Sequence, residues 1–285
     1  MPDIATLDIL GAITITDRPV DAEAPEGARW FFTIWASAGA MAVLPWAILL
    51  VRRGNPWLLL MVVGAVVASF LEPMLDTLIH LWYPTNLPFT AYSAFGIHIP
   101  LLVPPAYVFF GGVTAYGVYR LIERGLTFRQ FFVLEGALLV SDLILEYPGI
   151  LTDAYIYYGE QPFQLAGFPW WVTIPASTAV LIMGFLLWWL APRLRGPQKL
   201  LVVLVPPIGI GASYGAVAWP GMLAVNADLP GILTWGLAAL CLLPALAITW
   251  AIASTVATDR GKTTAQFPDP MSIASEPQPA ATPPR

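Results

Sequence analysis

Residues 57–80 read WLLLMVVGAVVASFLEPMLDTLIH, an apolar run that is long enough to cross a bilayer as one α-helix. The run carries two acids, Glu72 and Asp76, which are four residues apart and therefore share one helical face. A carboxylate inside a membrane is costly unless it faces a cavity or a partner. The run therefore predicts both a transmembrane helix and a candidate site on one of its faces.

The whole chain has the composition of an integral membrane protein. Of its 285 residues, 58% are hydrophobic and 11% are charged, whereas soluble domains carry about 25% charged residues. Seven apolar runs have spanning length, so we predict an all-α, multi-pass protein of the cell membrane with seven transmembrane helices. The predicted helices cover residues 30–51, 57–80, 99–120, 130–150, 170–191, 200–219 and 231–254.

The loops between these runs alternate in charge. Every second loop carries Lys or Arg, beginning with Arg52 and Arg53, and the loops between them carry none. All but Arg18 and Arg29 of the thirteen Lys and Arg residues fall on the basic side. The positive-inside rule then predicts that the N-terminus lies outside and the C-terminus lies in the cytoplasm.

The composition divides the chain into three parts. Residues 1–28 are acidic, and the predicted topology makes them an extracytoplasmic segment. They lack the basic start and apolar stretch of a signal peptide. Residues 29–256 are predicted to form the seven-helix membrane domain. Residues 257–285 are rich in Pro, Ala, Ser and Thr and cannot bury enough apolar surface to fold, so we predict a disordered cytoplasmic tail.

A second pair of acids, Asp142 and Glu146, lies in the run 130–150 and again has a spacing of four residues. At about 1.5 Å rise per residue, this pair and the first pair both lie in the outer half of the bilayer. We therefore predict that the two pairs share one pocket. Glu135 lies nearer the inner face, where we expect it to reach the membrane surface or to pair with Arg129.

Polar and aromatic side chains follow these acids in the sequence. His80 comes four residues after Asp76 and continues its stripe. Such residues can donate hydrogen bonds to a substrate, although an interfacial aromatic belt explains many of them equally well. Tyr107, Tyr155 and Tyr157 are further candidates for which the belt is the preferred interpretation. The predicted substrate-binding residues are His80, Trp82, Tyr83, Tyr92, His98, Tyr147 and Tyr158.

Neighbouring carboxyl groups in an apolar pocket can hold different charge states, because burial and mutual repulsion favour protonation of some of them. One member can then donate a proton while another accepts one, as general acid/base catalysis requires. From this chemistry we assign the acid and base roles to Glu72 and Asp142. Asp76, Glu146 and His80 are predicted to tune them.

Several other kinds of chemistry lack their motifs. The sequence has no Gly-rich phosphate loop, no G-x-S-x-G and no H-E-x-x-H. Its two His and one Cys have no zinc-ligand spacing, so we predict no metal and no cofactor. A retinal Schiff base is excluded because Lys199 and Lys262 lie outside the apolar runs, and the net charge of −5 argues against nucleic-acid binding.

Short motifs between about residues 60 and 190 resemble those of the AveC-like spirocyclases, a family of actinobacterial membrane proteins. The motifs are LEPMLD (71–76), WYP (82–84), AFG (94–96), DLILEYPG (142–149), YYG (157–159) and QPF (161–163). The resemblance implies spiroketal formation, in which a dihydroxy-ketone polyketide closes two rings at one carbon and loses water. In some members a further dehydration follows. It implies no catalytic residues, so the roles assigned above rest on chemistry alone.

Functional hypotheses of different classes remain open. The first is a membrane-embedded, cofactor-independent acid/base cyclase or dehydratase that acts on a hydrophobic polyketide- or terpenoid-like substrate. It would be a spirocyclase or resemble the small membrane-bound meroterpenoid cyclases. The alternative is a proton-coupled carrier or a lipid-binding protein without catalytic activity, because acids in spans also mark proton relays. A purely structural subunit is the third, and the buried acids weaken it.

Overall fold

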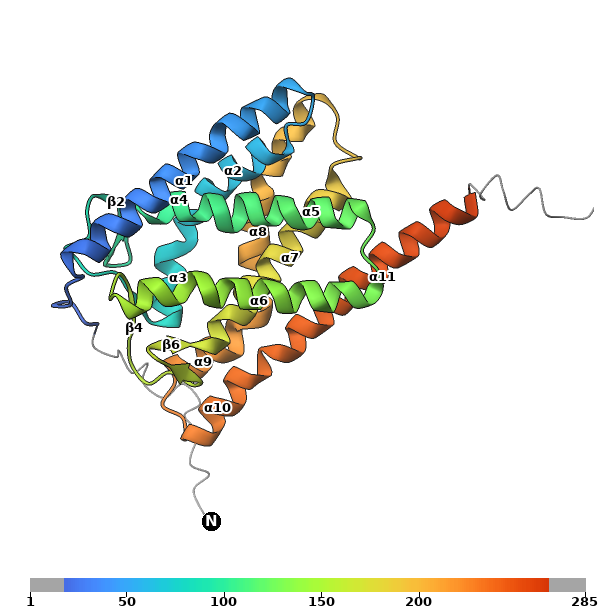
Figure 1. The fold of residues 1–285 in the computed structure, drawn as a ribbon. Coiled ribbons are helices and arrows are strands. Elements are labelled where there is room, and N and C mark those ends of the chain that lie inside the picture. The colour runs from blue at the N-terminus through green and yellow to red at the C-terminus, as the bar shows by residue number, and fades with distance from the viewer. Residues whose placement is uncertain (1–17, 267–285) are drawn as a thin grey trace, which may run out of the picture.

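The computed structural model describes residues 18–266, which form a bundle of seven helices (Figure 1). The all-α fold class is confirmed, and five of the helices are long and apolar enough to cross a membrane. Predictions for residues 1–17 and 267–285 lie outside the described residues. The five apolar helices are Glu26–Arg52, Trp57–Ile79, Trp170–Leu190, Gly196–Asn226 and Gly231–Asp259.

A proline breaks the second helix just before its first acid. After α1 (Glu26–Arg52), the helix α2 (Trp57–Ala68) passes into a single 3-10 turn, η1 (Ser69–Leu71), and then into α3 (Glu72–Ile79). Pro73 explains the break, because proline has no N–H to donate and fits only the first turn of a helix. Glu72 therefore begins a new helical segment with a changed direction.

The third and fourth helices frame the face that Figure 1 turns toward the reader. The third consists of α4 (Val103–Tyr107), the π-helical segment η2 (Val108–Thr114) and α5 (Ala115–Arg124). Gly125 ends it in the left-handed conformation that glycine adopts without strain. The fourth, α6 (Phe128–Leu151), begins with a capping box in which Thr127 N donates to Gln130 Oε1 at 2.8 Å.

The remaining helices complete the bundle. The fifth helix begins with η3 (Trp170–Val172) and continues as α7 (Thr173–Leu190). The sixth combines η4 (Gly196–Leu204), α8 (Val205–Ser213), the π-helical η5 (Tyr214–Ala218) and α9 (Trp219–Asn226). The last is α10 (Gly231–Leu240) with α11 (Leu242–Gln266), whose backbone stays helical beyond residue 256. The predicted start of the disordered tail at 257 is therefore wrong for the described residues.

Helix α7 is the centre of the protein. It packs against α5, α6, α8 and α11. In the most apolar stretch of this helix 78% of the residues are buried, compared with 11% in the corresponding stretch of α1. Small residues on α7 allow this close packing, and Gly184 faces Val118 and the carbonyl group of Ala115 on α5. The core of the bundle is therefore built around α7, while α1 lies at the periphery.

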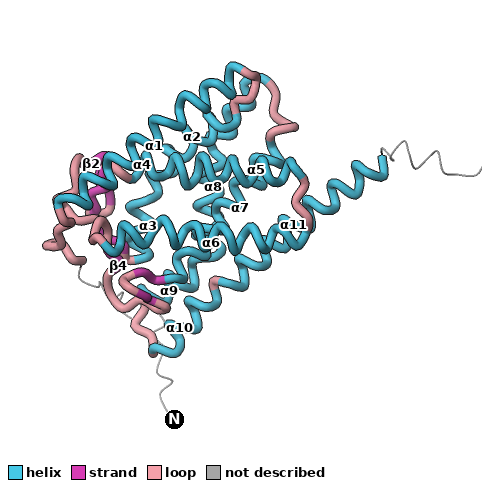
Figure 2. Tube along the Cα trace, in the orientation of Figure 1, coloured by secondary structure: helices cyan, strands magenta, loops and turns pink. Residues whose placement is uncertain are grey.

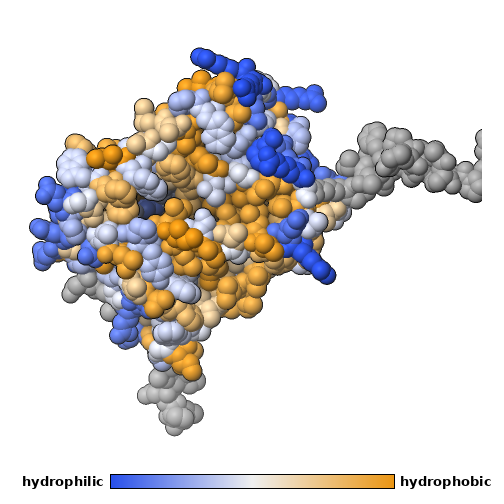
Figure 3. Space-filling model, in the orientation of Figure 1, coloured by the Kyte–Doolittle hydropathy of each residue, from blue (hydrophilic) through white to orange (hydrophobic). Residues whose placement is uncertain are grey.

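Helix α6 stands apart from the third helix. It packs against α7 and α11, whereas α4, η2 and α5 pack against α1, α2 and α7. Figure 1 shows α5 and α6 running alongside each other, and the space-filling view in Figure 3 has a hollow between α4 and the end of α6 near α3. This separation leaves room for a cavity between two helices that do not pack closely.

Short strands gather at one end of the bundle (Figure 2), where the sequence predicts only loops. Three antiparallel pairs form there, and one of them joins the segment after α3 to the segment after α6. These pairs are β1 (Leu81–Trp82) with β4 (Ile156–Tyr157), β2 (Thr90–Ala94) with β3 (Ile97–Pro100), and β5 (Gln164–Leu165) with β6 (Phe168–Pro169). The β1–β4 pairing holds the ends of the two acid-bearing helices together.

We predict that Gly184→Ala destabilises the protein, because its new methyl group meets Val118 and the α5 backbone. Overpacking of this kind costs about 1–3 kcal/mol, so the thermal unfolding midpoint, followed by tryptophan fluorescence in detergent, should fall. Gly136→Ala on α6 is the matched control. Its methyl group meets open space, so its midpoint should stay or rise, since alanine favours helix over glycine. Equal midpoints for Gly184→Ala and the parent would contradict tight α5–α7 packing.

Candidate functional site

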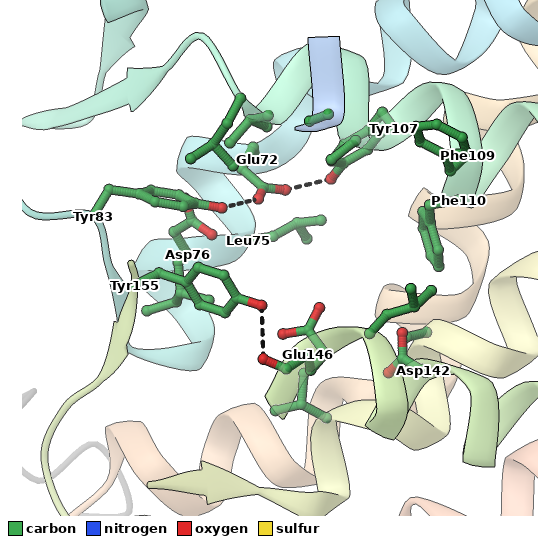
Figure 4. A pocket seen from close by; sticks show the side chains of 18 of the residues that line it. Glu72, Leu75, Asp76, Tyr83, Tyr107, Phe109, Phe110, Asp142, Glu146 and Tyr155 are labelled. Atoms are coloured by element: carbon green, nitrogen blue, oxygen red, sulfur yellow. Dashed lines mark hydrogen bonds between the residues drawn. The ribbon is translucent and has the colours of Figure 1, made fainter. Parts of the chain in front are cut away.

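One cavity of about 350 Å³ has all four predicted catalytic carboxylates in its wall. Glu72 and Asp76 enter from α3, and Asp142 and Glu146 enter from α6 on the opposite side (Figure 4). The spacing of four residues places both acids of each helix on the same face, and the gap between α6 and the third helix gives those faces a common space. Two pairs that are 70 residues apart in sequence therefore line one space.

Of the four carboxylates in the cavity wall, Glu72 accepts the most hydrogen bonds. Tyr83 Oη donates to Glu72 Oε1 at 2.7 Å, and the Tyr107 hydroxyl donates to Oε2. Burial raises the pKa of the Tyr83 hydroxyl well above its usual range, so that this group stays protonated and remains a donor at neutral pH. One donor on each oxygen suits a charged carboxylate and fixes its orientation in the cavity wall.

Asp76 has the opposite environment. It is 1% exposed and lines the cavity one turn after Glu72, yet its Oδ2 has no hydrogen-bond partner among the described residues. The charges of Glu72 and Glu146 are near enough to interact with it. A buried polar atom without a partner costs free energy, and such atoms in native proteins call for a functional or structural explanation.

The α6 acids reach the cavity in partly open positions. Both Asp142 and Glu146 are half-buried, and Leu145 between them is exposed on the outer surface of α6. Tyr155 Oη donates to the backbone carbonyl oxygen of Glu146 at 3.1 Å, and its ring lies beside that of Tyr83, with ring centres 6.0 Å apart (Figure 4). Burial also raises the pKa of the Tyr155 hydroxyl well above its usual range, so this hydroxyl stays protonated.

Tyrosines make up much of the polar wall besides the acids. The cavity is lined by Tyr83, Tyr107, Tyr155, Tyr157 and Tyr214. Only the first of these is among the predicted substrate-binding residues. For Tyr107, Tyr155 and Tyr157 the structure shows cavity positions where the sequence favours an interfacial belt. Their position beside the acids in space is set by the tertiary structure, and the local sequence carries no signal for it.

The two π-helical segments both supply cavity residues. The segment η2 contributes Phe109, Phe110 and Thr114, and η5 contributes Tyr214 as its first residue. A π-turn inserts an extra residue and rotates the following side chains about the helix axis, and such turns are frequent at functional sites. Tyr214 was missed in the sequence because it lies in an apolar run, away from every acid.

His80 does not line the cavity, contrary to its predicted place in the stripe of Asp76. Helix α3 ends at Ile79, and His80 follows in the left-handed conformation with φ 57°, which breaks the spacing of four residues. Its ring stacks on Tyr158 at 4.9 Å, and its Nε2 lies 3.2 Å from Asn226 Oδ1. Burial lowers the pKa of the His80 imidazole, so that it is neutral at pH 7.

Apart from Tyr83, the other predicted substrate-binding residues also lie outside the cavity wall. Tyr158 stacks on His80, and Trp82 is buried with the Arg18 guanidinium 5.8 Å from its ring centre. The Tyr92 hydroxyl donates to the Ser69 carbonyl oxygen. His98 Nδ1 in β3 lies 2.8 Å from Ser93 Oγ in β2, and Tyr147 Oη near the end of α6 donates to the Leu165 carbonyl oxygen in β5 at 3.1 Å.

Glu135 is a buried acid of a different kind. It forms no ion pair with Arg129 among the described residues, and this expectation from the sequence is wrong. Instead its Oε1 lies 3.0 Å from Ser177 Oγ and 2.7 Å from Thr178 Oγ1, both on α7. These hydrogen bonds join α6 to α7, so Glu135 has a structural role that helps hold α6 in position.

Charge balance distinguishes the cavity from an ordinary ion-pair cluster. Among the described residues, the cavity lining contains no Lys, Arg or His. In the same part of the chain, no group of three or more His, Cys, Asp or Glu residues has the geometry to hold a metal ion. The acids therefore face one another, tyrosine hydroxyls and apolar side chains.

Comparisons with known proteins leave this geometry as the main guide to function. No family model matches the chain, and no curated protein or solved structure is significantly similar to it.

Proposed function

We propose that this protein is a membrane-embedded, cofactor-independent acid/base cyclase of the spiroketal-forming type, acting on a hydrophobic polyketide- or terpenoid-like substrate. The observation that carries the proposal is the cavity of about 350 Å³ whose wall contains four carboxyl groups and no basic side chain among its described residues. The motif resemblance to AveC-like spirocyclases supplies the reaction type. Burial of acids among apolar walls supplies the reason why such groups can exchange protons with a lipophilic substrate.

The proposed reaction needs only proton transfers. One hydroxyl of a dihydroxy-ketone adds to the carbonyl carbon and gives a cyclic hemiketal. An acid protonates the hemiketal hydroxyl, which leaves as water and produces an oxocarbenium ion. The second hydroxyl attacks the same carbon and transfers its proton to a carboxylate. The balance is a dihydroxy-ketone to a spiroketal plus one water, without oxidation or reduction.

The environment of each acid favours particular roles. Glu72 accepts hydrogen bonds on both oxygens, from Tyr83 and Tyr107, and is therefore the base that receives the proton of the second hydroxyl. Asp142 is half-buried on the opposite wall and is the acid that protonates the departing hydroxyl. Asp76 and Glu146 line the same space, where their carboxyl oxygens stabilise the positive oxocarbenium ion.

The proposed setting is a seven-span topology with the N-terminus outside and the C-terminus in the cytoplasm. The positive-inside distribution of Lys and Arg supports it. In this orientation the strand-bearing end of the bundle faces outward, and the cavity lies in the outer half of the membrane. A substrate dissolved in the outer leaflet then has the shortest path to the carboxylates.

We predict that Glu72→Gln and Asp142→Asn each reduce cyclisation by about 10²-fold or more, the usual contribution of a general acid or base. The measurement is turnover of a lipophilic dihydroxy-ketone by the purified protein in lipid nanodiscs. Glu160→Gln, an exposed acid in a loop at the same end, is the control and should retain full turnover. Full product formation by both cavity variants would refute the catalytic proposal.

The tyrosines that orient Glu72 give a smaller predicted effect. Tyr83→Phe and Tyr107→Phe each remove one hydrogen bond from its carboxylate, and a loss of about 1 kcal/mol corresponds to roughly a fivefold lower kcat. Tyr147→Phe, which removes a hydroxyl outside the cavity, should keep kcat unchanged. Unaltered kcat in both cavity variants would mean that Glu72 needs no orientation by these hydroxyls.

The alternative is a proton-coupled carrier, and the open side of the cavity at Asp142 and Glu146 is the observation that favours it. A carrier moves protons across sealed vesicles when substrate is added, whereas a cyclase releases product without net proton flux. We expect no substrate-driven change of internal pH in proteoliposomes that contain a pH-sensitive dye. A substrate-dependent pH change that disappears in Asp142→Asn would establish transport instead.

A further inference from the structure

The acidic lining of the cavity, without a basic partner among the described residues, points to a class of ligand. Four carboxyl groups line the space, and the described lining residues contain no cationic side chain. Nearby His80 does not supply charge, because it is neutral at pH 7 and bonded to Asn226. Like charges that share an apolar space repel one another strongly. Bound protons or a positively charged ligand would therefore reduce the repulsion between these carboxyl groups.

Asp76 shows where a positive group would bind. This side chain is 1% exposed, lies in the cavity wall, and leaves Oδ2 without a hydrogen-bond partner among the described residues. Its carboxyl group lies beside the Tyr83 hydroxyl and faces the side from which Tyr155 and Glu146 approach (Figure 4). A ligand N–H group at this point would satisfy the free oxygen and gain a charge-assisted hydrogen bond.

Aromatic rings surround the same space. Trp35 of α1 and Phe109 of η2 stack with ring centres 6.0 Å apart, and both line the cavity together with Phe110 and Tyr155. The face of an aromatic ring attracts a cation that lies within about 6 Å of its centre, most strongly when water is excluded. Aromatic walls that are interspersed with carboxyl groups are thus suited to a substituted ammonium group.

A groove that suits a hydrocarbon chain borders the cavity at Leu145. Leu145 lines the cavity and is also part of a shallow groove on the surface of α6, formed with Gly136, Ala137, Val140, Ser141 and Ile144. Val140 and Ile144 are exposed on this surface, where lipid would contact them. An alkyl chain attached to a head group in the cavity can follow this groove into the membrane.

We propose that the cavity binds lipophilic amines, with the ammonium group between Asp76 and the α6 acids and the alkyl chain along α6. This inference rests on the proposed function, because an ammonium ion has the positive charge of the oxocarbenium intermediate and would occupy the same position. It also extends that function by excluding substrates with phosphate or carboxylate head groups. Such anionic groups would meet four acids and no described basic partner.

Calorimetric titration of the full chain in zwitterionic nanodiscs, corrected with empty nanodiscs, tests the proposal. The probes are N,N-dimethyldodecylamine, the neutral N,N-dimethyldodecanamide and the anionic dodecanoate. We expect the amine to bind at least about tenfold more tightly than the amide, which is the loss expected for one charge-assisted hydrogen bond. Dodecanoate should not bind above the empty-disc level. Equal affinities for amine and amide would overturn the proposal.

Two variants place the binding in the cavity. Asp76→Asn keeps the shape of the side chain and should weaken amine binding by about tenfold, and Asp142→Asn serves the same purpose if the first variant does not fold. Glu160→Gln removes one exposed acid at the same end and should leave the affinity unchanged. Undiminished binding by a folded cavity variant, or an equal loss in Glu160→Gln, would show surface attraction only and overturn the site.

The amine experiment and the cyclisation experiment have separate outcomes. Cavity-dependent amine binding by a protein that does not cyclise a dihydroxy-ketone would refute the proposed function while retaining the binding site. Cyclisation without amine binding would refute the ligand class while retaining the function. Inhibition of turnover by the amine, competitive with substrate, would support both.

Discussion

The contact on which the site depends is the pair of tyrosine hydroxyls on the Glu72 carboxylate. Tyr83 comes from the segment after α3 and Tyr107 from the end of α4, so the carboxylate joins three parts of the chain. In a low-dielectric interior these hydrogen bonds are strong, and losing one leaves one carboxylate oxygen without its donor. The break at Pro73 makes this geometry possible, because it starts a new helical segment at Glu72.

A second constraint is the separation between α6 and the third helix. Close packing everywhere would leave no room for a ligand, yet α6 must be held firmly to present Asp142 and Glu146. The Glu135 contacts with Ser177 and Thr178 and the capping box at Thr127 hold α6 against α7 and fix its start. The helix is thereby anchored on its α7 side and free on its cavity side.

The acids in the cavity wall provide one physical reason for both protonation and cation binding. A set of acids in an apolar space favours any positive species, whether a proton, an oxocarbenium ion or an ammonium group. Asp76 is buried and its Oδ2 has no hydrogen-bond partner in the described part of the chain, so this preference is least satisfied there. We infer that a site of this kind stabilises positively charged intermediates and discriminates against anions.

Hydropathy and helical periodicity by themselves determined much of this protein. They identified a helical membrane protein and placed the acids of each pair on one helical face, because burial in lipid and 3.6 residues per turn act locally along the chain. Only the tertiary structure decided how the two acid-bearing faces meet around a cavity, since α6 stands off from α5. It also decided that His80 leaves the stripe, because α3 ends in a left-handed residue, and that Tyr107 and Tyr214 face the acids. Those outcomes depend on how helices pack and where they end, and contacts between residues distant in sequence set both.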